Sequence, residues 1–251
     1  MIPMKINDAV VLVTGANRGL GRALAEASLK AGARRVYVGA RNPAQLESLV
    51  ALAPTRVVPL AIDITDARSL AAAAERAKDL TILVNNAGVL ASQDVLGSSP
   101  EAIAQDFATN TFGLLGATKA FLPALERAAA AGPERAAIVN VLSVVSLGNM
   151  PGLGGYSASK AAAHSLTQAL RADLATKHIR VHGVFAGAID TDMVRAMEMA
   201  KTSPEAVAQG ILDGVERGID DIAPDPMSRE LVAMYQRNPK DLERALSGGV
   251  G

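Results

Sequence analysis

Short β-branched apolar runs alternate with longer alanine-rich stretches along most of the chain, and this alternation constrains the fold more than any other feature. The apolar runs lack the in-and-out pattern of half-exposed strands, so they predict strands covered on both faces. The stretches between them are long enough to be crossovers between parallel strands. The sequence therefore predicts an α/β fold, a doubly wound parallel sheet with helices on both faces. Strands are expected at residues 10–14, 35–39, 57–62, 81–85, 136–142 and 180–185, and helices at 20–31, 43–53, 67–78, 100–130 and 156–178.

The length and texture of the chain favour a single domain. The chain has 251 residues, and α/β folds of about 250 residues often form one unit. No internal repeat, heptad array or linker marks a boundary. Residues 193–251 differ in being polar and rich in Met, with a further helix expected at 204–217. We expect them to be an extension, on the substrate side and at the C-terminus, of one domain that spans residues 1–251.

Composition excludes several classes of function. Lys plus Arg is 25 and Asp plus Glu is 25, so a formal net charge of zero favours neither a nucleic-acid partner nor a membrane surface. The absence of Cys excludes disulfides and thiolate chemistry. The three His residues (His164, His178 and His182) lack metal-ligand spacing, so no metal is expected. Without a signal-like start or a long apolar run, a cytoplasmic protein is predicted.

A glycine-rich turn follows the first predicted strand. Residues 14–21 read Thr-Gly-Ala-Asn-Arg-Gly-Leu-Gly and lead directly into a helix. Glycines allow backbone to approach a ligand closely, and the N–H groups and dipole at a helix start attract a pyrophosphate. A tight strand-to-helix turn without a ligand also needs glycine. The position after the first strand of an alternating chain favours the dinucleotide interpretation.

Four further motifs accompany this turn. Residues 85–88 read Asn-Asn-Ala-Gly, Tyr156 precedes Lys160 by four residues, Ser143 stands 13 residues before Tyr156, and Asn110 lies in the long fourth helix. Together with the T-G-x-x-x-G-x-G spacing of the turn, they resemble the classical short-chain dehydrogenase/reductase family from about residue 10 to residue 193. The resemblance implies a Rossmann-type fold and hydride transfer between a nicotinamide cofactor and a carbonyl or alcohol.

The resemblance also implies which residues bind the cofactor. Each has a structural alternative: Asp63 and Thr191 as helix caps, and the Asn86 segment as a turn that stabilises the sheet. The family usually has proline at the position of Ala186, so a looser turn is expected before Ile189. The implied cofactor-binding residues are Gly15, Asn17, Arg18, Gly19, Leu20, Gly21, Arg41, Asp63, Ile64, Asn86, Ala87, Gly88, Tyr156, Lys160, Ile189 and Thr191.

The end of the second predicted strand favours NADP(H) over NAD(H). An acid about 20 residues beyond the glycine turn would bind the ribose hydroxyls, whereas an arginine accommodates a 2′-phosphate. The chain has Gly-Ala-Arg at residues 39–41 and no acid there. Arg41, with help from Arg18, is predicted to hold the phosphate by charge-assisted hydrogen bonds. The alternative is that both are ordinary solvated arginines.

Catalysis is assigned to Asn110, Ser143, Tyr156 and Lys160. Hydride transfer to a carbonyl builds charge on oxygen, which a proton donor must meet. Tyr156 is predicted to be that donor, and the base in oxidation, with its pKa lowered by the Lys160 ammonium and the cofactor's positive ring. Ser143 would stabilise the substrate oxygen. The resemblance adds that Lys160 binds the ribose and that Asn110 supports a water leading to Lys160.

The apolar residues between Ser143 and Tyr156, and the methionines at 193, 197, 199 and 227, suggest an apolar small-molecule substrate. A homo-oligomer, a dimer or a tetramer, is expected. The C-terminal sequence departs from the family's closing strand, which weighs against the tetramer, and the alanine-rich faces of helices 100–130 and 156–178 suit a dimer.

Two rival functions stay open. One is a noncatalytic dinucleotide-sensing or interaction protein on the same fold, because a fold does not fix function. The joint presence of Ser143, Tyr156 and Lys160 argues against it. The other is an epimerase or dehydratase without net use of the cofactor, which the glycine spacing and the short C-terminal part disfavour.

Overall fold

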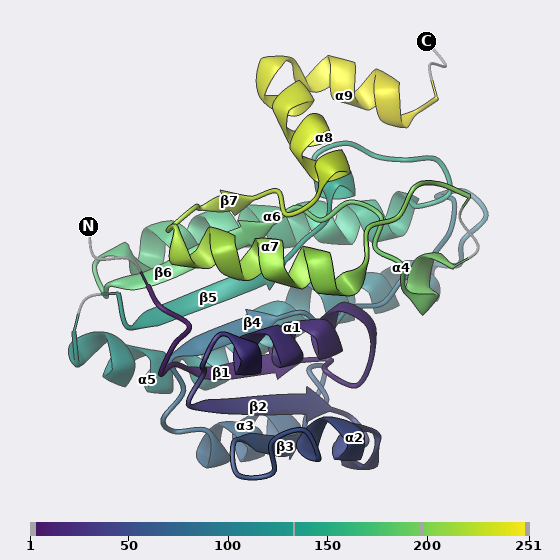
Figure 1. Ribbon diagram of the computed structural model, residues 1–251. Coiled ribbons are helices and arrows are strands. Elements are labelled where there is room, and N and C mark those ends of the chain that lie inside the picture. The colour runs from purple at the N-terminus through teal and green to yellow at the C-terminus, as the bar shows by residue number, and fades with distance from the viewer. Residues whose placement is uncertain (1–3, 133, 196–197, 249–251) are drawn as a thin grey trace.

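One parallel sheet organises the molecule. The computed structural model describes residues 4–132, 134–195 and 198–248, and within them seven strands lie in the order β3-β2-β1-β4-β5-β6-β7 (Figure 1). The doubly wound parallel α/β fold predicted from the sequence is confirmed. The strands are β1 (Val10–Thr14), β2 (Arg35–Ala40), β3 (Val57–Ala61), β4 (Ile82–Asn85), β5 (Ala136–Val141), β6 (Ile179–Val184) and β7 (Asp221–Ile222).

Two apolar cores cover the two faces of this sheet. On one face, α1 (Gly19–Lys30) packs beside α7 (Pro204–Glu216), with the short α2 (Glu47–Val50) near the β3 edge. On the other face lie α3 (Ala67–Arg76), α5 (Leu114–Ala130) and α6 (Gly154–Ala175). From β1 the strand order runs through β2 to β3 on one side, and from β4 it runs through β5 and β6 to β7 on the other, so the order reverses between β1 and β4. In such sheets ligands bind at this reversal, beyond the carboxyl ends of the strands.

The prediction of one continuous helix over residues 100–130 is wrong in its middle. The chain forms α4 (Pro100–Phe107), a π-helical segment η2 (Ala108–Gly113) and then α5. The wider turn carries Asn110 and Thr111, whose side chains hydrogen-bond to Ser159 on α6. These contacts between helices explain the local departure, because π-helical turns are commonly found where a side chain serves a site.

Two other helices differ from their predicted type or bounds. Residues 43–53 form a 3₁₀ turn η1 (Pro43–Leu46) followed by the four-residue α2, not one helix. The Asn42 side chain accepts a hydrogen bond from the N–H of Ala44, as expected for an N-cap before proline. The helix predicted from 156 to 178 is α6, which begins two residues earlier and ends at Ala175.

A buried polar chain joins the middle of the sheet to the helices beneath it. The Asn85 amide donates to Thr118 on α5 (3.1 Å) and to Asn140 on β5 (2.9 Å). The Asn140 amide donates in turn to Thr167 on α6 (2.9 Å). Buried amides need such partners, so this chain fixes α6 against β4 and β5. It therefore sets where the N-terminal half of α6 stands relative to the strand ends.

The C-terminal residues add one strand and two helices. The two-residue β7, which was not predicted as a strand, pairs in parallel with β6. It leads into α8 (Pro226–Arg237) and α9 (Pro239–Leu246), which extend from the body of the molecule beyond the β6–β7 edge (Figure 1). Leu242 and Leu246 of α9 are buried and lie against Gly148. Among the described residues, no helix has the length and apolar character needed to cross a membrane.

His182 is a buried titratable group in the middle of β6. Its side chain is fully buried, its Nδ1 lies 2.6 Å from the carbonyl oxygen of Ile219, and its Nε2 has no hydrogen-bond partner within the described residues. Burial is the main cause of a lowered pKa of this imidazole. The native protein thus keeps His182 neutral at a pH where the unfolded chain binds a proton.

We expect the free energy of unfolding to fall as the pH drops below about 6.5, with a contribution from His182 of at most about 1.4 kcal/mol per pH unit. Chemical denaturation between about pH 7.5 and 5.5 measures this slope. His182→Asn should remove the contribution, and the surface variant His178→Asn should keep it. Equal slopes in His182→Asn and the wild type would contradict the assignment.

Candidate active site

A cleft of about 850 Å³ opens at the carboxyl ends of the strands, at the reversal between β1 and β4. Its volume lies in the upper range of ligand pockets, roughly 300–1,000 Å³. Every residue that the sequence assigns to cofactor binding lines it, and so does Ser143. Asn110 is not among the lining residues. The cleft runs from Arg41 and Asp63 at one end to Met227 and Leu231 at the other.

The glycine turn is fastened to the end of β4. The Asn86 amide donates to the carbonyl oxygens of Thr14 (2.9 Å) and Gly15 (3.3 Å). The Thr14 hydroxyl accepts from the N–H groups of Asn86 (3.0 Å) and Ala87 (3.1 Å). The Asn86 segment therefore stabilises the strand ends, as its structural alternative proposed, and it also lines the cleft.

Backbone geometry in this turn leaves room for a ligand. Gly15 and Gly19 have φ of 66° and 53°, which side chains rarely adopt, and a methyl group on Gly21 would overlap the carbonyl oxygen of Gly15. The N-terminus of α1 also lacks a side-chain cap, unlike those of α4, α7 and α8. Its first N–H groups face the cleft region that a pyrophosphate would fill, so the turn fits a dinucleotide.

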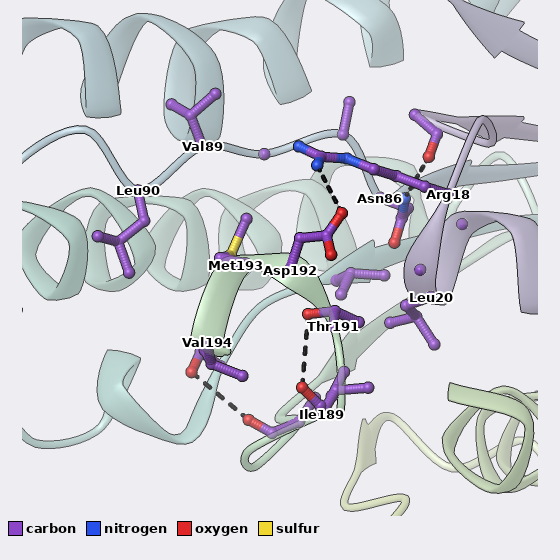
Figure 2. A pocket seen from close by; sticks show the side chains of 18 of the residues that line it. Arg18, Leu20, Asn86, Val89, Leu90, Ile189, Thr191, Asp192, Met193 and Val194 are labelled. Carbon is purple, nitrogen blue, oxygen red and sulfur yellow. Dashed lines mark hydrogen bonds and ion pairs between the residues drawn. The ribbon is translucent and has the colours of Figure 1, made fainter. Parts of the chain in front are cut away.

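The two candidate phosphate-binding arginines differ in their surroundings. Arg18 is 2.9 Å from Asp192 in an ion pair that crosses the cleft mouth, and both side chains are exposed (Figure 2). Arg41 stands exposed directly after β2. Asn17 donates to Gln45 (3.1 Å). In the protein alone, therefore, a side chain from across the cleft engages Arg18.

Asp63 closes a turn at the adenosine end of the cleft. Its Oδ1 accepts hydrogen bonds from the N–H (2.9 Å) and the hydroxyl (2.7 Å) of Thr65. These bonds, with a smaller contribution from the charge of Arg41, lower the pKa of the Asp63 carboxyl. The helix cap is Asp66 instead, which accepts from the N–H of Arg68 at the start of α3. The alternative reading of Asp63 as the helix cap is wrong.

The segment after β6, residues 186–194, forms the side of the cleft opposite the glycine turn, and the two sides are called its lips below. Ile189 pairs with Thr202 in an isolated parallel bridge, and the Thr191 hydroxyl donates to the carbonyl oxygen of Ile189 (3.4 Å; Figure 2). Thr191 precedes a short 3₁₀ turn η4 (Asp192–Val194), but its side chain makes no capping bond there. The cap interpretation of Thr191 is not observed. A methyl on Gly19 would lie 3.0 Å from the Thr191 methyl, so the two lips nearly touch.

Ser143, Tyr156 and Lys160 meet in the centre of the cleft. Ser143 follows β5, and Tyr156 and Lys160 lie on one face of the first turns of α6. The Ser143 hydroxyl donates to the carbonyl oxygen of Ala186 (3.4 Å), and the Lys160 ammonium lies 5.8 Å from the centre of the Tyr156 ring. Lys160 is buried and donates to the carbonyl oxygen of Val141 (2.8 Å).

Burial dominates the titration of this pair. Together with a smaller contribution from the nearby Asp106 carboxylate, it raises the pKa of Tyr156 to about 12, while the interaction with Ser143 opposes the shift. Burial lowers the pKa of Lys160 to about 8, against the opposing effect of Asp106. In the protein alone, burial outweighs the lowering of the Tyr156 pKa that we expected from Lys160. Tyr156 is accordingly a neutral phenol at neutral pH.

Asn110 lies behind the cleft wall. Its Oδ1 accepts from the N–H of Val89 (2.9 Å), and its amide donates to the carbonyl oxygen of Val89 (2.9 Å) and to Ser159 (3.0 Å). A methyl on Gly88 would lie 3.0 Å from Asn110 Oδ1 and 3.6 Å from Lys160 Nζ, so the two residues are close neighbours. The Asn110 side chain thus joins two segments of the protein, and its role in supporting a water that leads to Lys160 stays a prediction.

Asp106 belongs to this site although the sequence analysis did not single it out. Its carboxylate is fully buried and accepts hydrogen bonds from the N–H groups of Ala91 (2.8 Å) and Ser92 (3.1 Å) and from the Ser92 hydroxyl. A methyl on Gly155, beside Tyr156, would collide with that hydroxyl. The sequence signal is its place four residues before Asn110, on the same face of the predicted helix.

Apolar side chains dominate the half of the cleft beyond Ser143 and Tyr156. Met193, Met199 and Met227 are among them, as predicted, and Met197 lies outside the described residues. The described residues hold no group of three or more His, Asp or Glu arranged for a metal ion. The other apolar lining residues here are Leu90, Val144, Val145, Met150, Leu153 and Leu231.

Comparisons with known proteins agree with this geometry. The family model of the short chain dehydrogenases matches residues 9–202. D-erythrulose reductase from Gallus gallus is 35% identical over 211 residues, which are 84% of this chain and 83% of that protein. A short chain dehydrogenase from Burkholderia cenocepacia J2315, solved in complex with NADP, is 40% identical with a TM-score of 0.89, covering 97% of this chain and 99% of that one.

A 3-ketoacyl-(acyl-carrier-protein) reductase from Brucella melitensis, complexed with NADH, is 26% identical with a TM-score of 0.78, covering 89% of this chain and 93% of that one. The glycine turn, the convergent side chains and these matches define the class of protein. The chain belongs to the short-chain dehydrogenase/reductase family, whose members are oxidoreductases.

Gly21→Ala should weaken NADPH binding about tenfold or more, because the added methyl pushes Gly15 out of the turn that approaches the ligand. Fluorescence titration with NADPH measures the dissociation constant. Gly116→Ala in α5 is the matched control, since its methyl would meet the end of the Leu70 side chain at 3.2 Å and the Ile64 carbonyl oxygen at 3.8 Å, an ordinary contact distance. Unchanged affinity in a folded Gly21→Ala protein would contradict the role of the turn.

Proposed function

We propose that this protein is an NADP(H)-dependent carbonyl reductase or alcohol dehydrogenase, which interconverts a ketone or aldehyde and an alcohol. The convergence of Ser143, Tyr156 and Lys160 in a cleft that begins at an uncapped glycine turn is the observation that supports it most directly. Membership of an oxidoreductase family supports the same reaction class.

The residues of the chain have distinct parts in this reaction. A bound nicotinamide dinucleotide supplies or accepts the hydride. Ser143 and Tyr156 hydrogen-bond the substrate oxygen, and Tyr156, held as a phenol by burial, gives its proton to that oxygen as negative charge develops. The Lys160 ammonium, anchored on Val141, stabilises the phenolate that remains. In alcohol oxidation the same phenolate is the base.

The roles proposed for the other residues follow the cleft from end to end. The glycine turn (Gly15, Asn17, Gly19, Leu20 and Gly21) holds the pyrophosphate, and Asp63 and Ile64 contact the adenine. Asn86, Ala87 and Gly88 line the path to the nicotinamide, which Ile189 and Thr191 hold by its carboxamide. Asn110 supports Lys160 from behind the wall. The apolar half of the cleft takes an apolar, uncharged substrate.

Tyr156→Phe should lower kcat for carbonyl reduction by about 10²- to 10⁴-fold, because the ring stays and the proton donor is lost. NADPH oxidation against a panel of apolar ketones and aldehydes measures kcat, and fluorescence titration should show NADPH binding preserved. Tyr235→Phe on α8 is the matched control. Full activity of Tyr156→Phe would refute the mechanism, and NADPH binding by the wild type without turnover would favour the noncatalytic sensor.

The preference for NADP(H) rests on Arg41 and on the absence of an acid at residues 39–41. A carboxylate there would repel a 2′-phosphate, and an exposed guanidinium attracts one. Arg18 has to exchange its pairing with Asp192 to join Arg41 on the phosphate. Relatives bind either cofactor, since the Burkholderia dehydrogenase was solved with NADP and the Brucella reductase with NADH.

Arg41→Ala should raise KM for NADPH about tenfold, the expected loss of a charge-assisted hydrogen bond, and leave KM for NADH nearly unchanged. Steady-state kinetics with both cofactors measure the two values. Arg68→Ala, on the surface near the start of α3, is the control for loss of a positive charge. A wild type that prefers NADH, or equal effects on both cofactors, would contradict the preference.

Three further parts of the proposal concern the whole chain. We propose that residues 1–251 form one domain, that the protein is cytoplasmic, and that it is a homo-oligomer. A dimer through α5 and α6 agrees with the exposure of Phe112 in η2, between α4 and α5. Light scattering of the purified protein tests the oligomeric state.

A further inference from the structure

The turn that follows β6 carries Ile189 and Thr191 and contains no proline. Ala186 predicts a looser turn, because no proline ring restrains the backbone there. The turn is instead bonded to residues far along the chain. The N–H of Phe185 donates to the carbonyl oxygen of Ile222 in β7 (2.8 Å), and the N–H of Gly187 donates to the Asp225 carboxylate (2.9 Å).

The two carboxylate oxygens of Asp225 accept hydrogen bonds from two different segments. Its Oδ2 accepts the Gly187 bond, and its Oδ1 accepts from the N–H of Ser228 in the first turn of α8 (2.9 Å). Ser228 closes a capping box, because its hydroxyl accepts from the N–H of Asp225 (3.1 Å). Asp225 is only 1% exposed, and its carboxylate accepts hydrogen bonds from backbone N–H groups on both sides of the contact.

The turn and α8 are in close contact at this point. A methyl group on Gly187 would lie 2.7 Å from Asp225 Oδ1 and 3.1 Å from both Cβ and Sδ of Met227. Met227 and Leu231 of α8 line the apolar half of the cleft. One buried carboxylate therefore fixes the distance between the proposed nicotinamide lip and the proposed substrate wall.

We propose that Asp225 is a positioning residue that holds the 186–191 turn and α8 in the arrangement needed for hydride transfer. This inference rests on the proposed function. Asp225 acts first at the nicotinamide and substrate end, and its effect should be smallest at Arg41 and Asp63, which follow β2 and β3 on the other side of the reversal. Its loss should disturb the nicotinamide and substrate end more than the adenosine end.

The test compares Asp225→Asn with Ser228→Ala. The amide keeps one acceptor oxygen and turns an NH₂ group toward one of the two N–H donors, so it cannot make both bonds. Ser228→Ala removes its half of the capping box and leaves the bond between Gly187 and Asp225. Both variants should lower Tm, and only Asp225→Asn should lower kcat/KM for carbonyl reduction, by about tenfold to a hundredfold.

Binding provides a readout that helix stability alone would not change. In Asp225→Asn, the dissociation constant of NADPH should rise severalfold, and that of adenosine 2′,5′-bisphosphate, which has no nicotinamide, should rise much less. A change of equal size for both ligands, or kinetics matching those of Ser228→Ala, overturns the proposal. Failure of the wild type to bind NADPH at all overturns the proposed function itself, and with it this inference.

Gly187→Ala approaches the same contact from the other side. Its methyl would force the turn away from Asp225 and Met227, and the variant leaves both side chains of the capping box in the sequence. We expect the same selective loss of NADPH affinity and of kcat/KM, so the proposal stays testable even if Asp225→Asn does not fold. Wild-type values for a folded Gly187→Ala protein overturn it.

Discussion

The bonds between Thr14 and the Asn86–Ala87 segment are the contact on which the rest of the cleft depends. They join the ends of β1 and β4, the two neighbouring strands at which the chain order reverses. The reversal leaves a gap between the loops that leave these strands, and the glycine turn needs a fixed wall to keep its shape. Asn86 supplies that wall from its side chain and Thr14 from its hydroxyl. Every other cleft residue is placed relative to this corner.

Buried polar groups near the carboxyl ends of the strands then fix the helices and loops around this corner. Asn85 and Asn140 tie α5 and α6 to the sheet, Asp106 holds the 91–92 segment, and Asp225 holds the turn after β6. Each group would be costly to bury without partners, and each makes several hydrogen bonds. A network of this kind has few alternative arrangements, which suits a site that must present Ser143, Tyr156 and Lys160 at fixed spacing.

Local signals in the sequence were enough to predict the six longer strands, the main helices and the glycine turn, and the family resemblance supplied the other cleft-lining residues. Apolar runs, caps such as Asn42 and glycine spacing each act within a few residues, so they can be read without the fold. The π-helical segment around Asn110, the two-residue β7 and the contacts of Asp106 and Asp225 could not be read this way. The Asp225 bond to Gly187 spans 38 residues, and the Asn110 bond to Ser159 spans 49, so only the folded chain brings them together.

The bonds from β7 and α8 to the turn after β6 also bear on the order in which the protein matures. A chain made from its N-terminus can pair β1 to β6 and form the glycine turn before residues 222–228 have left the ribosome. The turn that carries Ile189 and Thr191 gains its bonds to β7 and to Asp225 only afterwards. Assembly of the cleft thus waits for contacts that form after β6 has been made, and a nascent chain that has already built most of its sheet still lacks a finished site.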